Sequence, residues 1–157
     1  MTDVRRHVPS ARHVGIDEVP FVINPVVGAR MRVLHASEAD NVYVVHGFMP
    51  AGLEVQTHRH TGPVIALTLS GAWAYRENDF VNRAGSYLYE PIDSVHTLFV
   101  PEDNTEETEM WSVVYGNTEY LDDNDEVTYV SNWKAMLNLY YEGCEAAGLP
   151  RPNGILL

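Results

Sequence analysis

The sequence predicts an all-β domain, a sandwich or barrel of short strands, with one helix near the C-terminus. Runs rich in Val, Ile, Tyr, Thr and Trp recur along the chain, and Gly, Pro, Asn or Asp separates each run from the next. Many short strands at near-regular spacing are typical of β-sandwiches and β-barrels. The chain has 157 residues, of which 45% are apolar, and this suits one domain with its own hydrophobic core. We therefore expect a single domain over residues 1–157.

Ten segments have the length and composition of strands. In chain order they are 31–35, 42–49, 53–60, 63–70, 72–77, 86–90, 94–100, 109–116, 118–122 and 126–130. Because Gly, Pro, Asn and Asp favour turns, we expect the chain to change direction at the residues between these segments.

One segment near the C-terminus has the period of a helix. Its apolar residues fall on one stripe: Trp133, Met136, Leu137, Tyr140 and Cys144. Ser131 is a suitable N-cap, and Gly148 followed by Pro150 is a typical helix end, so we expect a helix over about 131–147. Cys144 is the single cysteine of the chain. It has no internal disulfide partner, and we interpret it as a small buried hydrophobic residue.

Charge and hydropathy exclude some kinds of partner. The 22 acidic and 10 basic residues give a net charge of -12, which opposes binding to nucleic acids and to anionic membranes. No apolar run approaches the roughly 18 to 20 residues that span a bilayer. The first residues, MTDVRRHVPSARH, lack the apolar stretch of a signal peptide. We expect a cytoplasmic protein that binds neither nucleic acid nor membrane.

The segment THRHTGP, residues 57–63, contains a histidine pair separated by one residue. In a strand, His58 and His60 project to the same face and Arg59 to the other. His96 follows a strand and a turn that return the chain toward this pair. Three converging imidazoles form a neutral nitrogen ligand set that suits Zn, Fe, Ni, Cu or Mn. A surface pair without a metal is the alternative for His58 and His60 alone.

The other four histidines fit local structural roles better. His7 and His13 lie in a weakly patterned start of the chain, and His35 and His46 are single histidines within expected strands. A lone strand histidine is most simply a hydrogen-bonded core or surface group.

Two stretches resemble the motifs of the cupin superfamily. Gly52, His58, His60 and Gly71 follow the spacing of the first motif, and Gly85, Pro91 and His96 follow that of the second. The resemblance implies a single-domain cupin, a jelly-roll β-barrel, with its motif core at 52–100 and three of the four usual metal ligands. Where many cupins place a glutamate ligand this chain has Val64, which implies a three-histidine site.

Longer blocks are similar to the 2,4'-dihydroxyacetophenone dioxygenase family and more loosely to acetylacetone dioxygenase. The blocks are HRHTGPVIALTLSGAWAYRE, AGSYLYEPIDSVHTL and the helix end YYEGCEAAGL. The resemblance implies ferrous iron, O2 as a co-substrate and cleavage of a carbon-carbon bond next to the ketone of a small hydroxyketone or diketone. By their offsets from the histidines, Glu90 and Arg76 resemble groups that assist catalysis around the metal in those enzymes.

Two other functions stay open at this point. One is an isomerase or lyase that uses Zn or Mn as a Lewis acid, and the other is a non-catalytic cupin that binds a metal or a ligand. The chain contains no DNA-binding helical module or basic patch that would mark the second as part of a regulator.

Several further residues are candidates for the site or the surface. Glu54 and Gln56 share strand parity with His58 and could point into the barrel. Four strand aromatics could line a pocket or simply fill the core: Trp73, Tyr75, Trp111 and Tyr115. The apolar end GILL, residues 154–157, suggests packing on a neighbouring strand or on a second subunit. We expect a homodimer or a larger homo-oligomer.

Overall fold

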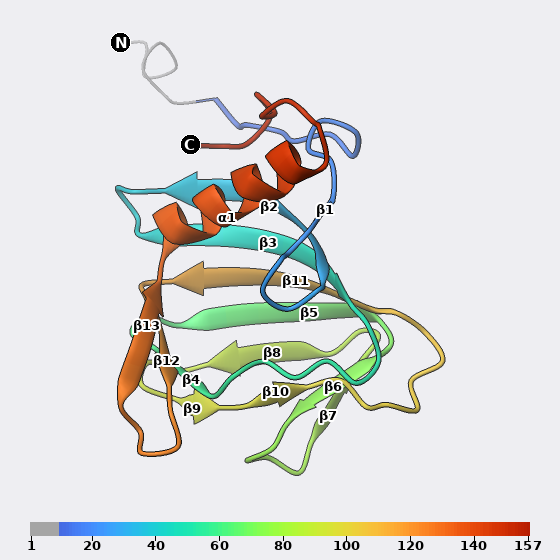
Figure 1. Ribbon diagram of the computed structural model, residues 1–157, viewed down its shortest axis with the longest axis vertical. Coiled ribbons are helices and arrows are strands. Elements are labelled where there is room, and N and C mark those ends of the chain that lie inside the picture. The colour runs from blue at the N-terminus through green and yellow to red at the C-terminus, as the bar shows by residue number, and fades with distance from the viewer. Residues whose placement is uncertain (1–9) are drawn as a thin grey trace, which may run out of the picture.

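Three antiparallel sheets enclose one interior in the computed structural model, which describes residues 10–157 (Figure 1). The largest sheet has the order β1-β2-β3-β11-β5-β8. Its strands are β1 Val22–Ile23, β2 Arg30–Ser37, β3 Val42–Met49, β5 Val64–Ser70, β8 Tyr87–Glu90 and β11 Thr108–Tyr115. The prediction of an all-β barrel with one C-terminal helix is confirmed.

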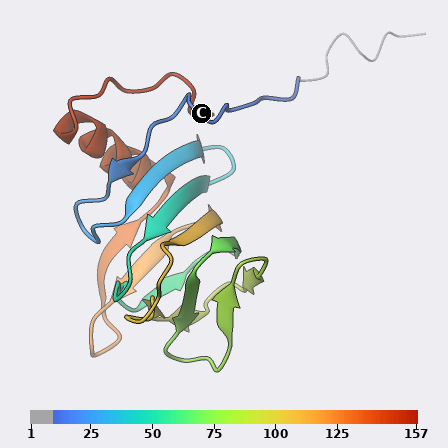
Figure 2. The same cartoon turned by 90° about the vertical axis from the view of Figure 1, so that its right-hand side faces the viewer.

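Two smaller sheets complete the barrel. The sheet β13-β12-β4-β9 contains β4 His58–His60, β9 Val95–His96, β12 Thr118–Leu121 and β13 Val127–Ser131. The sheet β10-β6-β7 contains β6 Ala72–Tyr75, β7 Val81–Arg83 and β10 Leu98–Phe99. The hairpin of β6 and β7 lies at one end of the molecule, and the single helix lies at the other (Figures 1 and 2).

The strands alternate between the barrel interior and the outside. Val45 of β3, Ala66 of β5 and Met110 of β11 line the interior cavity. Their neighbours His46, Leu67 and Trp111 face the opposite side of the sheet, because successive strand residues point to opposite faces. The interior face of the large sheet is therefore mostly apolar, with few polar side chains such as Glu90 at the end of β8.

The helix α1 spans Trp133–Ala146 and packs against β1, β2 and β3. Its N-cap is Asn132, whose side-chain oxygen accepts hydrogen bonds from the backbone N–H groups of Lys134 and Ala135, each at 3.0 Å. The expected N-cap, Ser131, lies one residue too early, because it is the last residue of β13. Cys144 is free and buried, as predicted.

Gly71 shows why one motif glycine is needed. It joins β5 to β6 with a φ of +68°, and a Cβ at this position would lie 2.5 Å from the Thr108 hydroxyl oxygen. That hydroxyl accepts a hydrogen bond from the backbone N–H of Ala72 at 3.2 Å and donates one to the carbonyl of Ala72 at 3.0 Å. Close approach of β11 to this turn therefore excludes a side chain.

The observed strands differ from the expected ones in several places, and the expected strand 94–100 forms two short strands, β9 and β10, in different sheets. Of the expected strand 53–60, only His58–His60 is a regular strand. The preceding residues are extended but make single hydrogen bonds, such as the one from the Val55 N–H to the Leu98 carbonyl at 2.9 Å. The short strands β1 and β7 were not predicted, because runs of two and three residues carry no measurable period.

The apolar C-terminal segment packs on its own chain. Leu156 accepts a hydrogen bond from the Ala36 N–H at 2.8 Å and donates one to the Leu34 carbonyl at 3.0 Å, and Ile155 is buried. Of the two environments expected for GILL, the structure shows a neighbouring strand. The apolar C-terminal segment therefore no longer supports the predicted homo-oligomer, which stays a prediction. Among residues 10–157 there is no helix with the length and apolar character needed to cross a membrane. His7 lies outside the described residues.

Candidate metal centre

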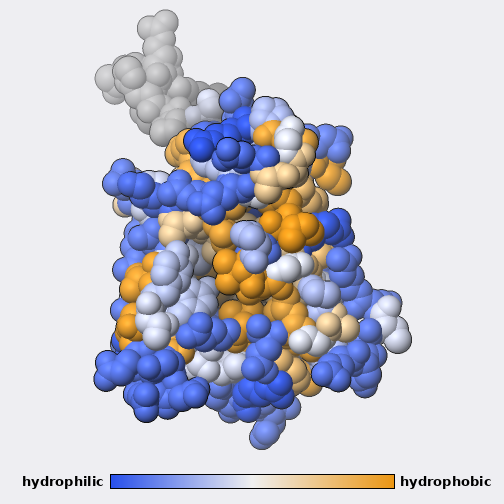
Figure 3. Space-filling view, viewed as in Figure 1, coloured by the Kyte–Doolittle hydropathy of each residue, from blue (hydrophilic) through white to orange (hydrophobic). Residues whose placement is uncertain are grey.

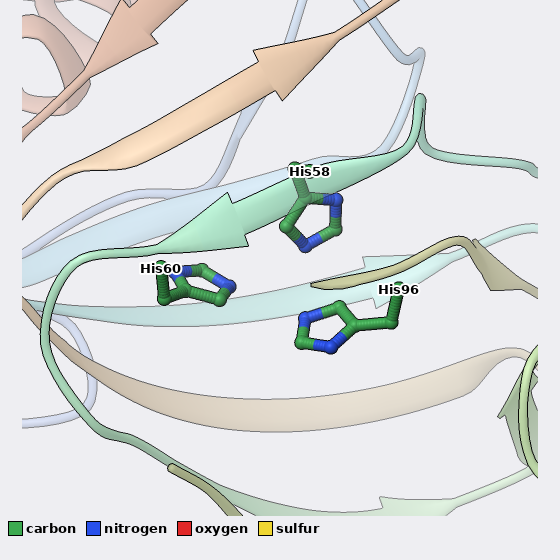
Figure 4. Close-up of side chains that lie close together, drawn as sticks. All are labelled: His58, His60 and His96. Carbon is green, nitrogen blue, oxygen red and sulfur yellow. The ribbon is translucent and has the colours of Figure 1, made fainter. Parts of the chain in front are cut away.

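Three buried histidines meet where β4 pairs with β9. His58 lies opposite His96 in the antiparallel register, and His60 lies further along β4 on the same side. One ring nitrogen of each lies within 4.8 Å of the others, and the rings turn toward a common point (Figure 4). The exposed fractions of His58, His60 and His96 are 7, 5 and 3%. Arg59 has the opposite orientation, and its Nε donates to a Glu119 carboxylate oxygen at 2.8 Å.

Hydrogen bonds orient the two β4 imidazoles. The Nδ1 of His58 donates to the Gln56 carbonyl at 2.8 Å, which fixes the ring and leaves Nε2 with a free electron pair. The Nδ1 of His60 lies 3.2 Å from the Thr118 hydroxyl, which in turn lies 3.3 Å from the Tyr43 hydroxyl. Such partners hold a ligating imidazole in position in many metal sites.

Glu90, the last residue of β8, brings a carboxylate to the same point. Its Oε2 lies 3.2 Å from the Nε2 of His60 and 3.1 Å from the Nε2 of His96. The Tyr75 hydroxyl donates a hydrogen bond to Glu90 Oε1, and the Tyr75 ring stacks on His96 with 4.1 Å between centroids. The carboxylate is therefore held by a tyrosine that also contacts the histidine cluster.

The sheet register explains how a carboxylate reaches the histidines. Val64 stands where the cupin resemblance led us to look for a glutamate, and its cross-strand partner in β8 is Glu90. Residues paired in this way carry their side chains on the same face of a sheet. The neighbouring strand thus supplies the acidic group that β5 lacks.

Burial and neighbouring side chains together set the charges of His58, His60 and Glu90. Burial lowers the pKa of His60 to about 4 and also lowers the pKa of His58. For Glu90, burial raises the pKa, but His96, His60 and the Tyr75 hydroxyl together outweigh it, and the pKa lies below its ordinary value. At neutral pH His58 and His60 are therefore neutral and lie beside an ionised carboxylate, the state in which both kinds of group can ligate a cation.

Two buried atoms at the centre lack a hydrogen-bond partner among the described residues. They are the Nε2 of His96 and the Oε2 of Glu90, which lie close together without hydrogen-bond geometry. Unpaired buried polar atoms are costly. A divalent cation bound at the histidines would engage the His96 nitrogen and would bring a positive charge next to the Glu90 carboxylate. The residues fit a transition-metal ion, because imidazole nitrogens with a carboxylate suit Fe, Zn, Mn, Ni or Cu.

The centre faces a cavity of about 200 Å³ inside the barrel. His58, His60, Glu90 and Tyr75 form its polar wall, and most of the remaining lining residues are apolar side chains of the barrel strands. A small molecule in this cavity would contact the histidines on one side and hydrocarbon on the others. Mostly apolar pockets with a few convergent polar groups are typical of small-molecule sites.

The structure does not bring Arg76 to the histidines. Its guanidinium donates to Glu54 at 3.0 Å and lies 4.1 Å from the centre of the Phe99 ring, and 57% of its side chain is exposed. Tyr75 is the last residue of β6 and points inward, so alternation sends Arg76 outward. From sequence, Tyr75 was only a possible pocket or core aromatic. Its strand parity with Trp73 was the signal that both side chains point to the same face of β6.

The remaining candidates divide between the two sides of the barrel. Trp73 and Tyr75 line the inner cavity, whereas Trp111 and Tyr115 do not. Gln56 donates its side-chain N–H to the Leu121 carbonyl at 2.7 Å, so its amide is engaged by backbone rather than free for a ligand at the histidines.

A fourth buried histidine, His46, occupies a different environment on β3. Its Nδ1 accepts a hydrogen bond from the Arg32 Nε at 3.2 Å, and its Nε2 donates to Glu109 at 2.7 Å. Its ring lies 4.8 Å from that of Trp111 and 5.0 Å from that of Phe21. Burial lowers the pKa of His46, so a neutral ring with both nitrogens engaged is expected at neutral pH.

Comparison with known protein families identifies the family of this chain. Residues 9–119 match the family described as the ChrR cupin-like domain. The chain belongs to the ChrR cupin-like family. No curated protein matches the sequence.

Solved cupin structures share the fold across most of the chain. An RmlC-like cupin protein from Ralstonia eutropha JMP134 superposes with a TM-score of 0.85 at 27% identity, covering 98% of each chain. A second cupin-like protein from that organism, of unknown function, has a TM-score of 0.82 at 26% identity and 90% coverage of each chain. An acetylacetone dioxygenase from Acinetobacter johnsonii has a TM-score of 0.74 at 20% identity, covering 87% of this chain and 93% of its own. This ChrR-like cupin therefore has the fold of that enzyme.

Proposed function

We propose that this ChrR-like cupin is a non-haem iron(II) dioxygenase that cleaves a carbon-carbon bond next to the ketone of a small hydroxyketone or diketone. The observation that carries the proposal is the set of three buried, converging imidazoles beside an ionised carboxylate, facing a largely apolar cavity. The shared fold with an acetylacetone dioxygenase supports the same reaction class.

In this proposal His58, His60 and His96 hold the metal through their Nε2 atoms. Bound ferrous iron supplies Lewis acidity toward the substrate oxygens and reactivity toward O2. Neutral ligands leave the metal's positive charge largely uncompensated, which favours an anionic substrate such as an enolate. The substrate is then a compound that carries oxygen atoms on two adjacent carbons or on two carbons separated by one other carbon. It loses one proton on binding.

Glu90 is placed to take that proton. Its carboxylate lies on the wall of the cavity and is ionised. Oε2 accepts the proton from the carbon next to the substrate ketone, and the electron pair of the broken C–H bond delocalises onto the ketone oxygen to form the enolate. The Tyr75 hydroxyl remains hydrogen-bonded to Oε1 of Glu90 during this transfer. The apolar wall excludes water, which strengthens the interaction between the enolate and the positively charged centre.

The test is oxygen consumption by protein loaded with ferrous iron under anaerobic conditions. We expect one or more members of a panel of α-hydroxyketones and β-diketones to give a new absorption band before O2 is admitted, and then to consume O2 and form two shorter carbonyl products. Protein loaded with zinc is the control, because zinc has no redox chemistry. An iron-loaded protein that neither develops the band nor consumes O2 with any member of the panel contradicts the proposal.

A second candidate is a non-catalytic cupin that binds a metal or small ligand, and the match to the ChrR cupin-like family favours it. It predicts tight metal binding with no turnover. A third outcome, product formation by zinc-loaded or manganese-loaded protein without O2, would instead indicate the isomerase or lyase.

A further inference from the structure

A second cavity adjoins the one at the histidines. It measures about 530 Å³ and lies between α1, the hairpin of β12 and β13, the turn after β1 and the extended segment before β4. A hollow bordered by hydrophobic residues is visible below α1 in the space-filling view (Figure 3). We call this second cavity the outer chamber, and we call the cavity at the histidines the inner chamber.

The two chambers share one boundary. Five residues line both: Asn24, Val27, Val55, Tyr120 and Met136. The ring of Tyr120 lies 5.7 Å from that of His58 in the inner chamber and 5.9 Å from that of Tyr129 in the outer one. The path between chambers therefore runs past an aromatic side chain that contacts the candidate metal centre.

The outer chamber presents hydrocarbon rather than free polar groups. Its apolar lining includes Val26, Tyr129, Ala135 and Leu139, and Val26 and Tyr129 are among the exposed large hydrophobic residues of the molecule. Apolar residues thus gather around an opening where water would otherwise contact them.

Three polar side chains of its wall are engaged by other parts of the chain. Asn24 Oδ1 accepts from the Val26 N–H at 2.9 Å, and Gln56 donates to the Leu121 carbonyl at 2.7 Å. Glu54 forms an ion pair with Arg76. Because these groups are engaged and most of the other lining residues present hydrocarbon, the chamber favours an apolar ligand.

We infer that the outer chamber binds the apolar chain of an elongated ligand whose oxygen-bearing head lies in the inner chamber. The ligand class is a keto compound with a linear alkyl or aryl-alkyl tail, larger than the inner chamber alone can hold. The position of the head rests on the proposed function, whereas the apolar tail site rests on the chamber itself. The outer chamber alone falls within the roughly 300–1,000 Å³ that is typical of ligand pockets.

Binding to zinc-loaded protein tests this inference without turnover. The probes are acetylacetone and homologues in which a butyl, hexyl or octyl chain replaces one methyl group, with affinity measured by calorimetry. Burying one methylene improves affinity by about fourfold, so affinity should rise with each lengthening until the chamber is full. Ala135→Phe places an aromatic ring in the chamber and should sharply reduce this gain while leaving acetylacetone affinity unchanged. Ala135→Leu should remove part of it, and serves if the phenylalanine variant does not fold.

Ala146→Phe is the matched control, because Ala146 is on the same helix but is exposed and outside both chambers. It should keep the full dependence on chain length. Equal affinity for all chain lengths in the wild type, with acetylacetone bound, overturns the inference and leaves the proposed function standing.

A second series separates the chamber from the metal chemistry. Hexanol, octanol and decanol carry no chelating head, and their affinities should also rise with length in the wild type and not in Ala135→Phe. If no diketone binds but the alcohols show this pattern, the proposed function fails and the apolar site stands. If neither series depends on chain length, the apolar site is overturned.

Discussion

His46 and the cluster of His58, His60 and His96 show that similarly buried histidines can differ in their ability to bind a metal. All lie in strands and are buried, and burial lowers the pKa of His46 as it does those of His58 and His60. Both nitrogens of His46 are engaged, by Arg32 and Glu109. In the cluster, ring nitrogens converge with no hydrogen-bond donor between them. Convergence of open nitrogens, rather than burial or a lowered pKa, is what distinguishes a candidate metal centre.

The largest expected effect is on metal binding. His96→Ala removes one of three nitrogen ligands and should weaken metal affinity by more than the roughly 100-fold that loss of an outer hydrogen-bond partner can cost. Metal content after dialysis, measured by mass spectrometry, gives the answer. His46→Ala is the control and should keep its metal. Full metal content in His96→Ala would show that the cluster is not a metal site.

Glu90→Gln tests the carboxylate that faces the cluster. The amide keeps the volume of the side chain but cannot take a proton, so turnover should fall by about 10- to 100-fold while most of the metal is retained. Turnover and metal content are measured on the same preparation, together with the anaerobic substrate band. Wild-type turnover contradicts the role of Glu90 as base, and loss of metal equal to that in His96→Ala would make it a ligand instead.

His46→Ala should act on stability instead of chemistry. It leaves the buried Arg32 Nε and the Glu109 carboxylate without their partner, and an unsatisfied buried group costs about 1–3 kcal/mol. Urea denaturation should show this decrease in the free energy of unfolding, with unchanged metal stoichiometry. His46→Gln, which can restore one hydrogen bond, should recover part of the loss. A stability equal to that of the wild type would mean that the pair contributes nothing.

The pH dependence of the metal-free protein should report the same histidines. The folded-state pKa values of His46, His58 and His60 are lowered, so the unfolded chain binds protons first as the pH falls below about 6.5. The free energy of unfolding should be constant above that pH and decrease below it, by up to about 1.4 kcal/mol per pH unit for each histidine. For His60 the decrease ends near its folded pKa of about 4. His46→Gln should have a shallower slope in urea titrations between neutral pH and pH 5; an identical slope contradicts the assignment.

Arg76→Ala should have the smallest effect. Arg76 is exposed and paired with Glu54 outside the inner chamber, and exposed pairs contribute little. We expect turnover within error of the wild type and a change in the free energy of unfolding below about 0.5 kcal/mol. A large loss of turnover would restore Arg76 to the catalytic role that its sequence offset suggested.

The histidine cluster could be predicted from sequence because its signals are local. The alternation of a strand places His58 and His60 on one face, and motif spacing returns His96 to them. The contact of Glu90 with the cluster depends instead on the pairing of β5 with β8, which no local pattern encodes. Arg76 differs, because a local signal was available: strand alternation from Trp73 and Tyr75 already places Arg76 on the opposite face of β6.

The fold class followed from composition, but details of the elements did not. Asn132 and Ser131 are both good N-caps, and the pairing of Ser131 with Thr118 in β12 decides between them. The outer chamber had no sequence signal, because its wall combines α1, the β12–β13 hairpin and two loop segments that are far apart along the chain.

The pairing of β4 with β9 also orders the events of folding. Between these strands the chain forms β5 to β8, and β4 is held on its other edge by β12, which comes later still. An unfolded chain therefore offers a metal only the local His58–His60 pair, since bringing in His96 requires closing a long loop. The three histidines come together only when the barrel closes, so a metal bound at the proposed site would enter a folded scaffold rather than nucleate it. The identity of that metal would then depend on which ion reaches the folded barrel first.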